Sequence, residues 1–297
     1  DLLTEAFLPR PSLVEPVLSH RITQVACGLY HTVCVTASGM AMSWGGNESG
    51  QLGHSGEITR TVRPMVVQVT GAGQSWSSRR RASRVACGDL FTLILTSRAE
   101  VFSCGVGECV GGDGRDRKQA APVPSLAGFP TVWMACGNSH SVVIGAGGDA
   151  LGFGLNTHGQ LGVGEVESGE GPAVLHPRPI VGTFSKPLTL PPATAATPDD
   201  VPSPRDSNPT GAGSATPTKP AAAAAAPVSR VGGDGASGGC MKSGATPPAF
   251  LAARAACGQS HTVLVSTAGD AWACGRNRSG QLGVDPDIVG ETSTPVR

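Results

Sequence analysis

The stretch "ACGNSHSVVIGAGGDALGFGLNTHGQLGVG", from Ala135 to Gly164, occurs in related form four times along the chain. Each copy contains Ala-Cys-Gly, and the four cysteines are Cys27, Cys87, Cys136 and Cys257. Four residues after these cysteines stand His31, Phe91, His140 and His261. Three copies carry Gly-Gln-Leu-Gly, at residues 50–53, 159–162 and 280–283, whereas the second reads "ECVGGDG" at residues 108–114. A unit of about 50 residues that recurs in register is typical of a repeat protein, because one unit cannot bury its apolar face alone.

Each repeat has the pattern of short strands. The segment "HTVCVTASGMAMSWG" (residues 31–45) gives an apolar run, a turn with Gly39, and a second run ending at Trp44. The fourth copy, "HTVLVSTAGDAWACG" (residues 261–275), repeats this pattern with Gly269 at the turn. Two such runs predict a β-hairpin, and a further short apolar run precedes each Ala-Cys-Gly. Three to four strands per unit, without helical periodicity, predict an all-β chain whose units are propeller blades.

The nine cysteines are explained by the repeat better than by a metal or disulfide framework. Four occupy the Ala-Cys-Gly position, and three more (Cys34, Cys104 and Cys274) fall on repeated apolar positions. Only Cys109 and Cys240 lie outside this frame, and no Cys-x-x-Cys occurs. We therefore expect small, buried, structural cysteines and no metal site.

The repeated histidines and glycines also have an architectural interpretation. One histidine per repeat places these side chains a blade apart, which favours a hydrogen-bonded structural role over a shared ligand or a general base. Phe91 shows that the position tolerates loss of the imidazole. The Gly-Gln-Leu-Gly glycines suit turns that need a positive φ. A phosphate-binding loop is disfavoured, because it requires a helix directly after it and none follows here.

The segments "CGLYHT", "SWGGNESGQLG", "CGNSHS", "FGLNTHGQLG", "CGQSHT" and "CGRNRSGQLG" carry a resemblance to a known family. This combination resembles the regulator of chromosome condensation repeat, over about residues 8–165 and 250–297. The second copy departs from the pattern. The resemblance implies a β-propeller of the regulator of chromosome condensation type. Because that family folds as seven blades, four repeats imply about four blades of an expected seven, an open series with unpaired edges.

The chain divides into three predicted parts. Residues 1–184 hold propeller blades one to three, with repeats centred on Cys27, Cys87 and Cys136. Residues 185–248 form an insertion rich in Pro, Ala, Gly, Ser and Thr, which we expect to be disordered because it cannot bury enough apolar surface. Residues 249–297 hold blade four and the first strand of the next, since "STPVR" at 293–297 resembles the Pro-bearing segments "VRPMVV" and "AAPVPS".

Two regions carry candidate regulatory or binding residues. Ser203 and Thr216 precede prolines in the insertion and are candidate phosphorylation sites, although a neutral linker is the simpler interpretation. Ser83 lies in "RRAS", a basic-directed kinase motif. The surrounding loop concentrates one tryptophan with four arginines, and its candidate partner-binding residues are Trp76, Arg79, Arg80, Arg81 and Arg84. Such a cluster suits an acidic partner, whereas many exposed arginine runs are only solvated.

Composition narrows the function. The net charge is zero and 15% of residues are charged, so no global field draws the chain to nucleic acid or a membrane, and no apolar run is long enough to span one. No Ser-His-acid pattern, paired carboxylates or metal-ligand spacing is visible, so we expect no catalytic, cofactor-binding or metal residue. We also expect an intracellular location, in the cytoplasm or nucleus.

Three functions follow from the resemblance. The leading hypothesis is a non-catalytic protein–protein interaction scaffold. Its partner would be a protein, either a small GTPase or one with an acidic surface. The alternative is a guanine nucleotide exchange factor for a Ran-type small GTPase, with exchange possible only as part of a complete propeller. A light sensor like the plant UV-B photoreceptor is disfavoured, because the chain has only four tryptophans and "GLYHT" and "GQSHT" replace "GWRHT".

Overall fold

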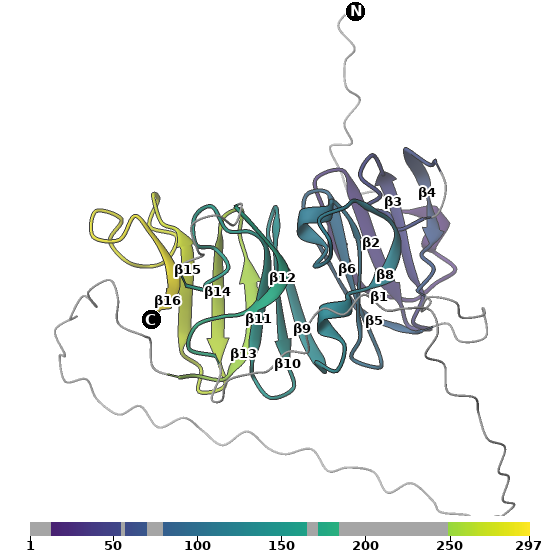
Figure 1. Cartoon of the computed structure of the whole chain (residues 1–297). Helices are drawn as coiled ribbons and strands as arrows, with labels where there is room; N and C mark the ends of the chain where they lie inside the picture. The colour runs from purple at the N-terminus through teal and green to yellow at the C-terminus, as the bar shows by residue number, and fades with distance from the viewer. Residues whose placement is uncertain (1–12, 55–56, 70–79, 165–171, 184–248) are drawn as a thin grey trace, which may run out of the picture. The chain divides into compact units, whose positions relative to one another are not determined.

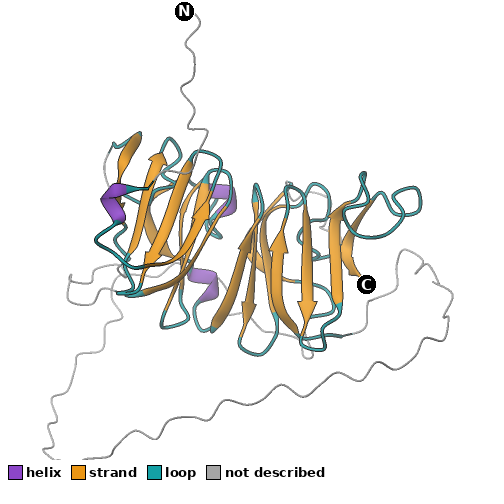
Figure 2. Ribbon diagram, turned by 180° about the vertical axis from the view of Figure 1, so that it is seen from behind, coloured by secondary structure: helices purple, strands orange, loops and turns teal. Residues whose placement is uncertain are grey.

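The computed structural model describes residues 13–54, 57–69, 80–164, 172–183 and 249–297. These residues form an all-β structure of four antiparallel sheets with four strands each (Figure 1). A short 3-10 turn, η1 (Glu15–Val17), precedes the first strand, and two more, η3 (Gly107–Cys109) and η4 (Pro124–Leu126), lie between strands; all three are purple in Figure 2. The predicted fold class is therefore confirmed. The disordered insertion expected at 185–248 lies outside the described residues.

Each sheet contains four strands in chain order. Sheet 1 consists of β1 (Ile22–Cys27), β2 (His31–Thr36), β3 (Ala41–Gly46) and β4 (Arg60–Val66). Sheet 2 consists of β5 (Ala82–Cys87), β6 (Phe91–Thr96), β7 (Val101–Gly105) and β8 (Arg117–Pro122). Sheet 3 consists of β9 (Thr131–Cys136), β10 (His140–Gly145), β11 (Ala150–Leu155) and β12 (Ala173–Pro179). Sheet 4 consists of β13 (Ala252–Cys257), β14 (His261–Ser266), β15 (Ala271–Arg276) and β16 (Glu291–Val296).

The Pro-bearing segments close a sheet instead of opening the next one. The final strand, expected to be the first strand of a further blade, pairs with β15 as the fourth strand of sheet 4. In the same way β4 pairs with β3 and β8 with β7. The physical reason is that proline lacks a backbone N–H and is tolerated on an edge strand, where one side of the ladder is unpaired. The Pro-bearing strand therefore begins the predicted sequence repeat but is the last strand of the observed sheet, so the two units differ by one strand.

Neighbouring sheets bury apolar side chains between them. The cluster between sheets 1 and 2 contains Val33, Val85 and Ile94. Leu93 from sheet 2 packs with Val143 and Phe153 from sheet 3, and Val142 packs in a third cluster with Leu264 and Trp272 from sheet 4. The core is thus a series of layers between consecutive sheets. This explains why both faces of a middle sheet are apolar, and it means that a single repeat would leave an apolar face uncovered.

Candidate functional site

The Ala-Cys-Gly motif places a glycine directly beneath an aromatic ring. A Cβ atom on Gly137 would lie 2.1 Å from Cε1 of His140 and 2.4 Å from the carbonyl oxygen of Gly258 in the next sheet. The second repeat shows the same contact, since a Cβ on Gly88 would lie 1.9 Å from Cε1 of Phe91. Only glycine leaves room for both the ring and the neighbouring backbone. The spacing Gly-x-x-His is therefore a packing requirement.

Two buried histidines of the repeat, His31 and His140, each join two sheets through a threonine. Nε2 of His140 lies 2.9 Å from Oγ1 of Thr262, and this hydroxyl donates to the carbonyl oxygen of Gln160 at 2.7 Å. A carbonyl oxygen can only accept, so the threonine hydroxyl donates its one hydrogen to Gln160 and accepts a hydrogen bond from His140 Nε2–H. The neutral imidazole thus carries its proton on Nε2. We call this arrangement a His–Thr–Gln relay.

An identical relay joins sheets 1 and 2. Nε2 of His31 lies 2.9 Å from Oγ1 of Thr92, which donates to the carbonyl oxygen of Gln51 at 2.7 Å. Nδ1 of both histidines is buried without a hydrogen-bond partner. A proton placed there would be buried without an acceptor, and burial accordingly lowers the pKa of His31 and of His140 to about 4. These imidazoles hold sheets together and are unsuited to proton transfer near neutral pH.

The cysteines that the structure describes carry free thiols. Burial raises the pKa of Cys104, Cys109 and Cys257 to about 12, so these thiols stay protonated and poorly nucleophilic. The described part of the chain contains no cluster of three His, Cys, Asp or Glu side chains that could hold a metal. Cys240 lies outside the described residues.

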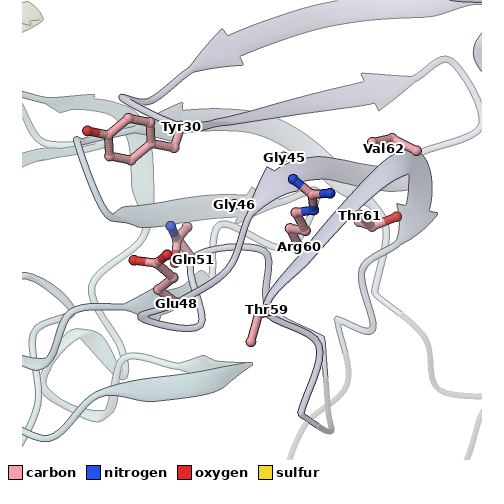
Figure 3. Close-up of a pocket in the computed structure, with 9 residues that line it drawn as sticks. All are labelled: Tyr30, Gly45, Gly46, Glu48, Gln51, Thr59, Arg60, Thr61 and Val62. Carbon is pink, nitrogen blue, oxygen red and sulfur yellow. The ribbon is translucent and has the colours of Figure 1, made fainter. Parts of the chain in front are cut away.

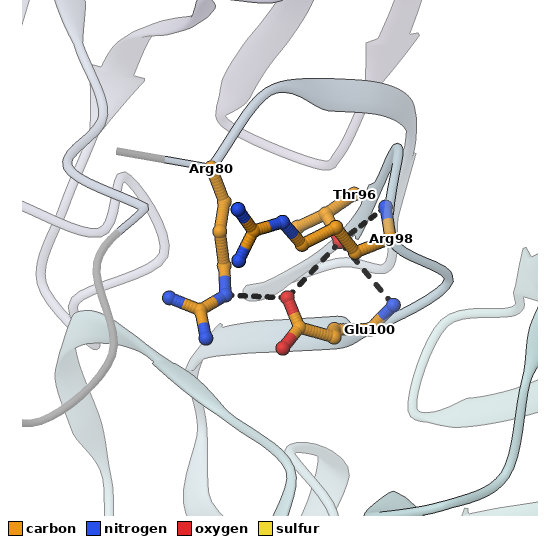
Figure 4. A network of polar contacts seen from close by, with 4 residues as sticks. All are labelled: Arg80, Thr96, Arg98 and Glu100. Carbon is orange, nitrogen blue, oxygen red and sulfur yellow. Dashed lines mark hydrogen bonds and ion pairs between the residues drawn. The ribbon is translucent and has the colours of Figure 1, made fainter. Parts of the chain in front are cut away.

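The structure separates the arginine-rich segment into parts with different surroundings. Trp76 and Arg79 lie outside the described residues. Nε of Arg80 donates to a carboxylate oxygen of Glu100, which also accepts from Thr96 Oγ1 at 3.4 Å (Figure 4). The Arg80 side chain is only 13% exposed and also lies over the ring of Phe102. Arg80 therefore anchors the end of the segment to the β6–β7 turn.

The neighbouring candidates are arranged differently. Arg81 is exposed, and its Nε donates to the carbonyl oxygen of Ser38 at 3.0 Å. Ser83 is exposed on β5, where its hydroxyl donates to the carbonyl oxygen of Leu95 at 3.1 Å. A kinase would have to detach this hydroxyl from the paired strand. The other phosphorylation candidates, Ser203 and Thr216, lie outside the described residues.

Arg84 belongs to a site that sequence reasoning did not assemble. Its guanidinium lies over the ring of Trp133, 4.5 Å from the centroid, and the guanidinium of Arg254 lies 4.4 Å from the same centroid. Nε1 of Trp133 donates to the carbonyl oxygen of Ala255 at 3.0 Å, which fixes the indole against the next sheet. These residues lie on β5, β9 and β13, the first strands of three consecutive sheets. We call this arrangement the Arg–Trp–Arg stack.

A register signal for the stack is present in the sequence. Arg84, Trp133 and Arg254 all stand three residues before the cysteine of Ala-Cys-Gly, and Gln24 holds that position in the first repeat. The Gln24 side chain bonds both backbone groups of Val85 at 3.0 Å, so this position reaches the neighbouring sheet there too. Comparing one position across all repeats would have found the stack, whereas the search for clusters within one loop did not.

A pocket of about 540 Å³ opens on sheet 1 (Figure 3). Its lining combines the end of β3, the β3–β4 loop and the start of β4 with the loop before β2: Tyr30, Gly45, Gly46, Glu48, Gln51, Thr59, Arg60, Thr61 and Val62. Val62 is 83% exposed. No helix in the part of the chain that the structure describes is long and apolar enough to cross a membrane.

Comparisons with curated proteins find relatives that share part of the chain. The ultraviolet-B receptor UVR8 of Arabidopsis thaliana is 30% identical over 161 residues, which are 53% of this chain and 35% of the receptor. The E3 ubiquitin-protein ligase HERC2 of Homo sapiens is 31% identical over 160 residues, which are 52% of this chain and 3% of the ligase. The chain thus spans about a third of the first relative and a small fraction of the second.

The solved structures and family models agree with the fold. Prp20p from Saccharomyces cerevisiae, described with its binding to Gsp1p and histones, matches 98% of this chain and 52% of its own with a TM-score of 0.60 at 17% identity. The Regulator of chromosome condensation (RCC1) repeat matches residues 22–51, 134–160 and 254–281, and a second model of this repeat matches residues 38–95. These matches coincide with the glycine–ring contacts and the relays, and they show that the chain contains repeats of the regulator of chromosome condensation family.

Proposed function

We propose that this chain is a protein-interaction scaffold whose Arg–Trp–Arg stack binds an acidic segment of a partner protein. The observation that carries the proposal is the stack itself. Two guanidinium groups are held over one indole, and no carboxylate among the described residues lies within ion-pair distance of Arg84 or Arg254. Paired arginines without acidic partners are the usual means of binding carboxylates.

The stack is also organised before any partner arrives. Stacking on Trp133 restricts both arginine side chains without consuming their N–H donors, because a π face accepts no conventional hydrogen bond. One nitrogen of Arg254 donates to the carbonyl oxygen of Ala253 at 2.9 Å, and its other N–H groups have no partner in the described residues. The indole is fixed by its bond to Ala255. A partner carboxylate would therefore meet donors whose ordering cost has already been met within the fold. Tryptophan and arginine are also the residue types that most often dominate binding at protein interfaces.

The earlier candidates contribute unequally to this proposal. Arg84 remains central, whereas Arg80 already has its partner in Glu100. Arg81 is exposed and lies near the same strand, so it would add long-range attraction more than a fixed contact. Because the net charge of the chain is zero, the attraction is local and should weaken steeply with added salt.

Nucleotide exchange on a small GTPase is a separate hypothesis that rests on the family resemblance. The match to Prp20p, at 17% identity, supports the shared fold only. Exchange requires loops that open the nucleotide site of the GTPase, and the Arg–Trp–Arg stack is not such a device. An exchange factor accelerates release of labelled GDP from a small GTPase, whereas a scaffold does not. This measurement therefore distinguishes the two hypotheses.

The test measures binding of a fluorescent oligoglutamate peptide by anisotropy, at about 50 mM and 500 mM salt. Changing Arg84 and Arg254 together to Gln should weaken binding at low salt at least about tenfold. The matched control changes Arg81 and Arg278, two exposed arginines outside the stack, to Gln, and should weaken binding less than threefold. Equal losses in the two double variants would refute a specific site. Accelerated GDP release from a panel of small GTPases would favour exchange instead.

A further inference from the structure

The first strand of each sheet leaves one backbone edge free, because it pairs only with the second strand. Along an antiparallel pair, every other residue turns its N–H and C=O away from the neighbouring strand. In sheet 3 the bond from Gly137 N to the carbonyl oxygen of His140 fixes this alternation, and Met134 on β9 is a residue whose backbone groups face the free edge. The residue at the same position in sheet 2 is Val85 on β5, which allows a direct comparison.

At Val85 an amide from the neighbouring sheet occupies the free edge. Gln24 Oε1 accepts a hydrogen bond from Val85 N, and Gln24 Nε2 donates one to the Val85 carbonyl oxygen, both at 3.0 Å. The side-chain amide thus makes the two bonds that one residue of an added antiparallel strand would make. The free edge of a first strand can therefore be closed by a donor and an acceptor in strand geometry.

At Met134 the corresponding edge has no such partner. Arg84 holds the position of Gln24 in sheet 2, and its guanidinium lies over the ring of Trp133. Neither backbone group of Met134 has a hydrogen-bond partner among the described residues. Met134 is only 7% exposed, and an unpaired donor and acceptor at a buried residue are costly. Sheet 3 packs against sheet 2 on one face and against sheet 4 on the other, so this edge lies between parts of the chain that the structure describes.

The free edge at Met134 adjoins the Arg–Trp–Arg stack, because Met134 directly follows Trp133. In a strand added to β9, the residue opposite Met134 projects to the same side as Met134, and the residues before and after it project to the side of Trp133. Those two residues are about 7 Å apart along the strand. The guanidinium carbons of Arg84 and Arg254 are at most about 9 Å apart, since each lies within 4.5 Å of the Trp133 centroid. Acidic side chains at alternate positions therefore match the two arginines.

We infer that a partner protein adds an acidic segment, in extended form, to the free edge of β9. One residue of the segment exchanges two backbone hydrogen bonds with Met134, and the acidic residues before and after it bind Arg84 and Arg254. This binding mode rests on the proposed function and narrows it to segments with acidic residues at alternate positions. In strand addition the backbone bonds provide affinity and the alternating side chains provide specificity. A helical segment does not fit, because its backbone groups are already bonded within the helix.

The first experiment measures the anisotropy of fluorescent peptides with the 297-residue chain at about 50 mM salt. The peptides Thr-Glu-Thr-Glu-Thr and Thr-Glu-Glu-Thr-Thr have the same composition and charge. The first should bind at least about fivefold more tightly, because only its glutamates project to one side of an extended segment. N-methylation of its central threonine removes the N–H that bonds the Met134 carbonyl, and should weaken binding about tenfold. The matched control is N-methylation of the following glutamate, whose N–H points away from β9; it should weaken binding less than about threefold.

Two variants of Arg84 test the edge from the side of the protein. Arg84→Gln and Arg84→Met both remove one charge and should both weaken binding of the alternating peptide. Arg84→Gln also supplies the amide that Gln24 supplies to Val85, so it should close the edge and leave only binding that N-methylation does not affect. Arg84→Met should retain the tenfold effect of N-methylation. Acidic peptides that bind regardless of spacing and N-methylation would overturn this binding mode and leave the proposed function standing. Absence of binding by every acidic peptide would overturn both.

Discussion

The junction between sheets 3 and 4 is polar at its centre, whereas the junction between sheets 2 and 3 is apolar at the same place. His140, Thr262 and Gln160 form a relay in the former. In the latter Phe91 replaces the histidine and Ser141 replaces the threonine. Cys109 stands where the glutamine would be, since Ser103 Oγ donates to the carbonyl oxygen of Val110 as Ser43 Oγ does to that of Leu52. Phe91 packs with Leu93, Val143 and Phe153. The ring on its glycine is retained, the imidazole is lost, and a hydroxyl remains at the threonine position in Ser141.

This difference teaches that the imidazole is the replaceable member of the relay. A buried donor or acceptor without its partner costs more than the hydrogen bond contributes, so a member can be removed at low cost only where the groups left behind keep another partner. The apolar junction compensates separately, since Sγ of Cys109 on the divergent "ECVGGDG" segment donates to the carbonyl oxygen of Ser139 at 3.3 Å. Both junctions have an aromatic ring packed on a glycine, and they differ in whether that ring makes a hydrogen bond to the next sheet.

The largest effect should come from the glycine beneath the ring, which both junctions share. Gly137→Ala places a Cβ against His140 and against the fixed backbone oxygen of Gly258, so we expect a loss of about 3 kcal/mol or more in unfolding free energy. Chemical denaturation measures it. Gly147→Ala is the control, since its Cβ would meet only the flexible Asp149 carboxylate at 3.1 Å, and it should cost less than 1 kcal/mol. Similar losses at the two positions would contradict the packing argument.

Within the polar junction, replacing Thr262 should reduce the unfolding free energy more than replacing His140. Thr262→Val leaves both His140 Nε2–H and the Gln160 carbonyl without their main partner, and should cost about 2–4 kcal/mol. His140→Phe introduces the ring found in the apolar junction and leaves Thr262 bonded to Gln160, so we expect a loss of about 1 kcal/mol in unfolding free energy. Thermal and denaturant unfolding of the two variants provide the comparison. If the phenylalanine variant were the less stable one, the relay would not be organised around threonine.

The fold was more predictable from sequence than the site. Two apolar runs around a Gly-bearing turn in residues 31–45, and their repetition, predict the hairpins, although β2 is buried on both faces and shows no period of two. Strand membership at "STPVR" was misplaced by one sheet, because pairing partners depend on contacts that a repeat pattern does not order. The Arg–Trp–Arg stack was missed because its members are 49 and 121 residues apart and meet only when three sheets align.

Low pH should destabilise the two junctions that contain a buried histidine and leave the apolar junction unaffected. Burial lowers the pKa of His31 and His140 to about 4, whereas histidine in an unfolded chain titrates near pH 6.5. The unfolded state therefore binds more protons in between, and stability falls as the pH decreases from about 6.5 to about 4. Replacing both histidines by Phe should flatten this part of the stability curve measured by denaturation. An unchanged slope in that variant would assign the acid sensitivity to other groups.

The smallest expected effect concerns the hairpin turns, where sheet 2 again departs from the others. Gly39, Gly148 and Gly269 have positive φ at this turn, and sheet 2 holds Ala99 there with a φ of 62°. Alanine in this region is strained by about 1 kcal/mol through its Cβ, and glycine would remove the strain but gain freedom in the unfolded chain. We therefore expect Ala99→Gly to stabilise the protein by about 0.5 kcal/mol. Gly269→Ala is the reciprocal change in open surroundings and should destabilise by a similar amount, as differential scanning calorimetry can resolve. Destabilisation by both substitutions would show that Ala99 contributes packing that outweighs its strain.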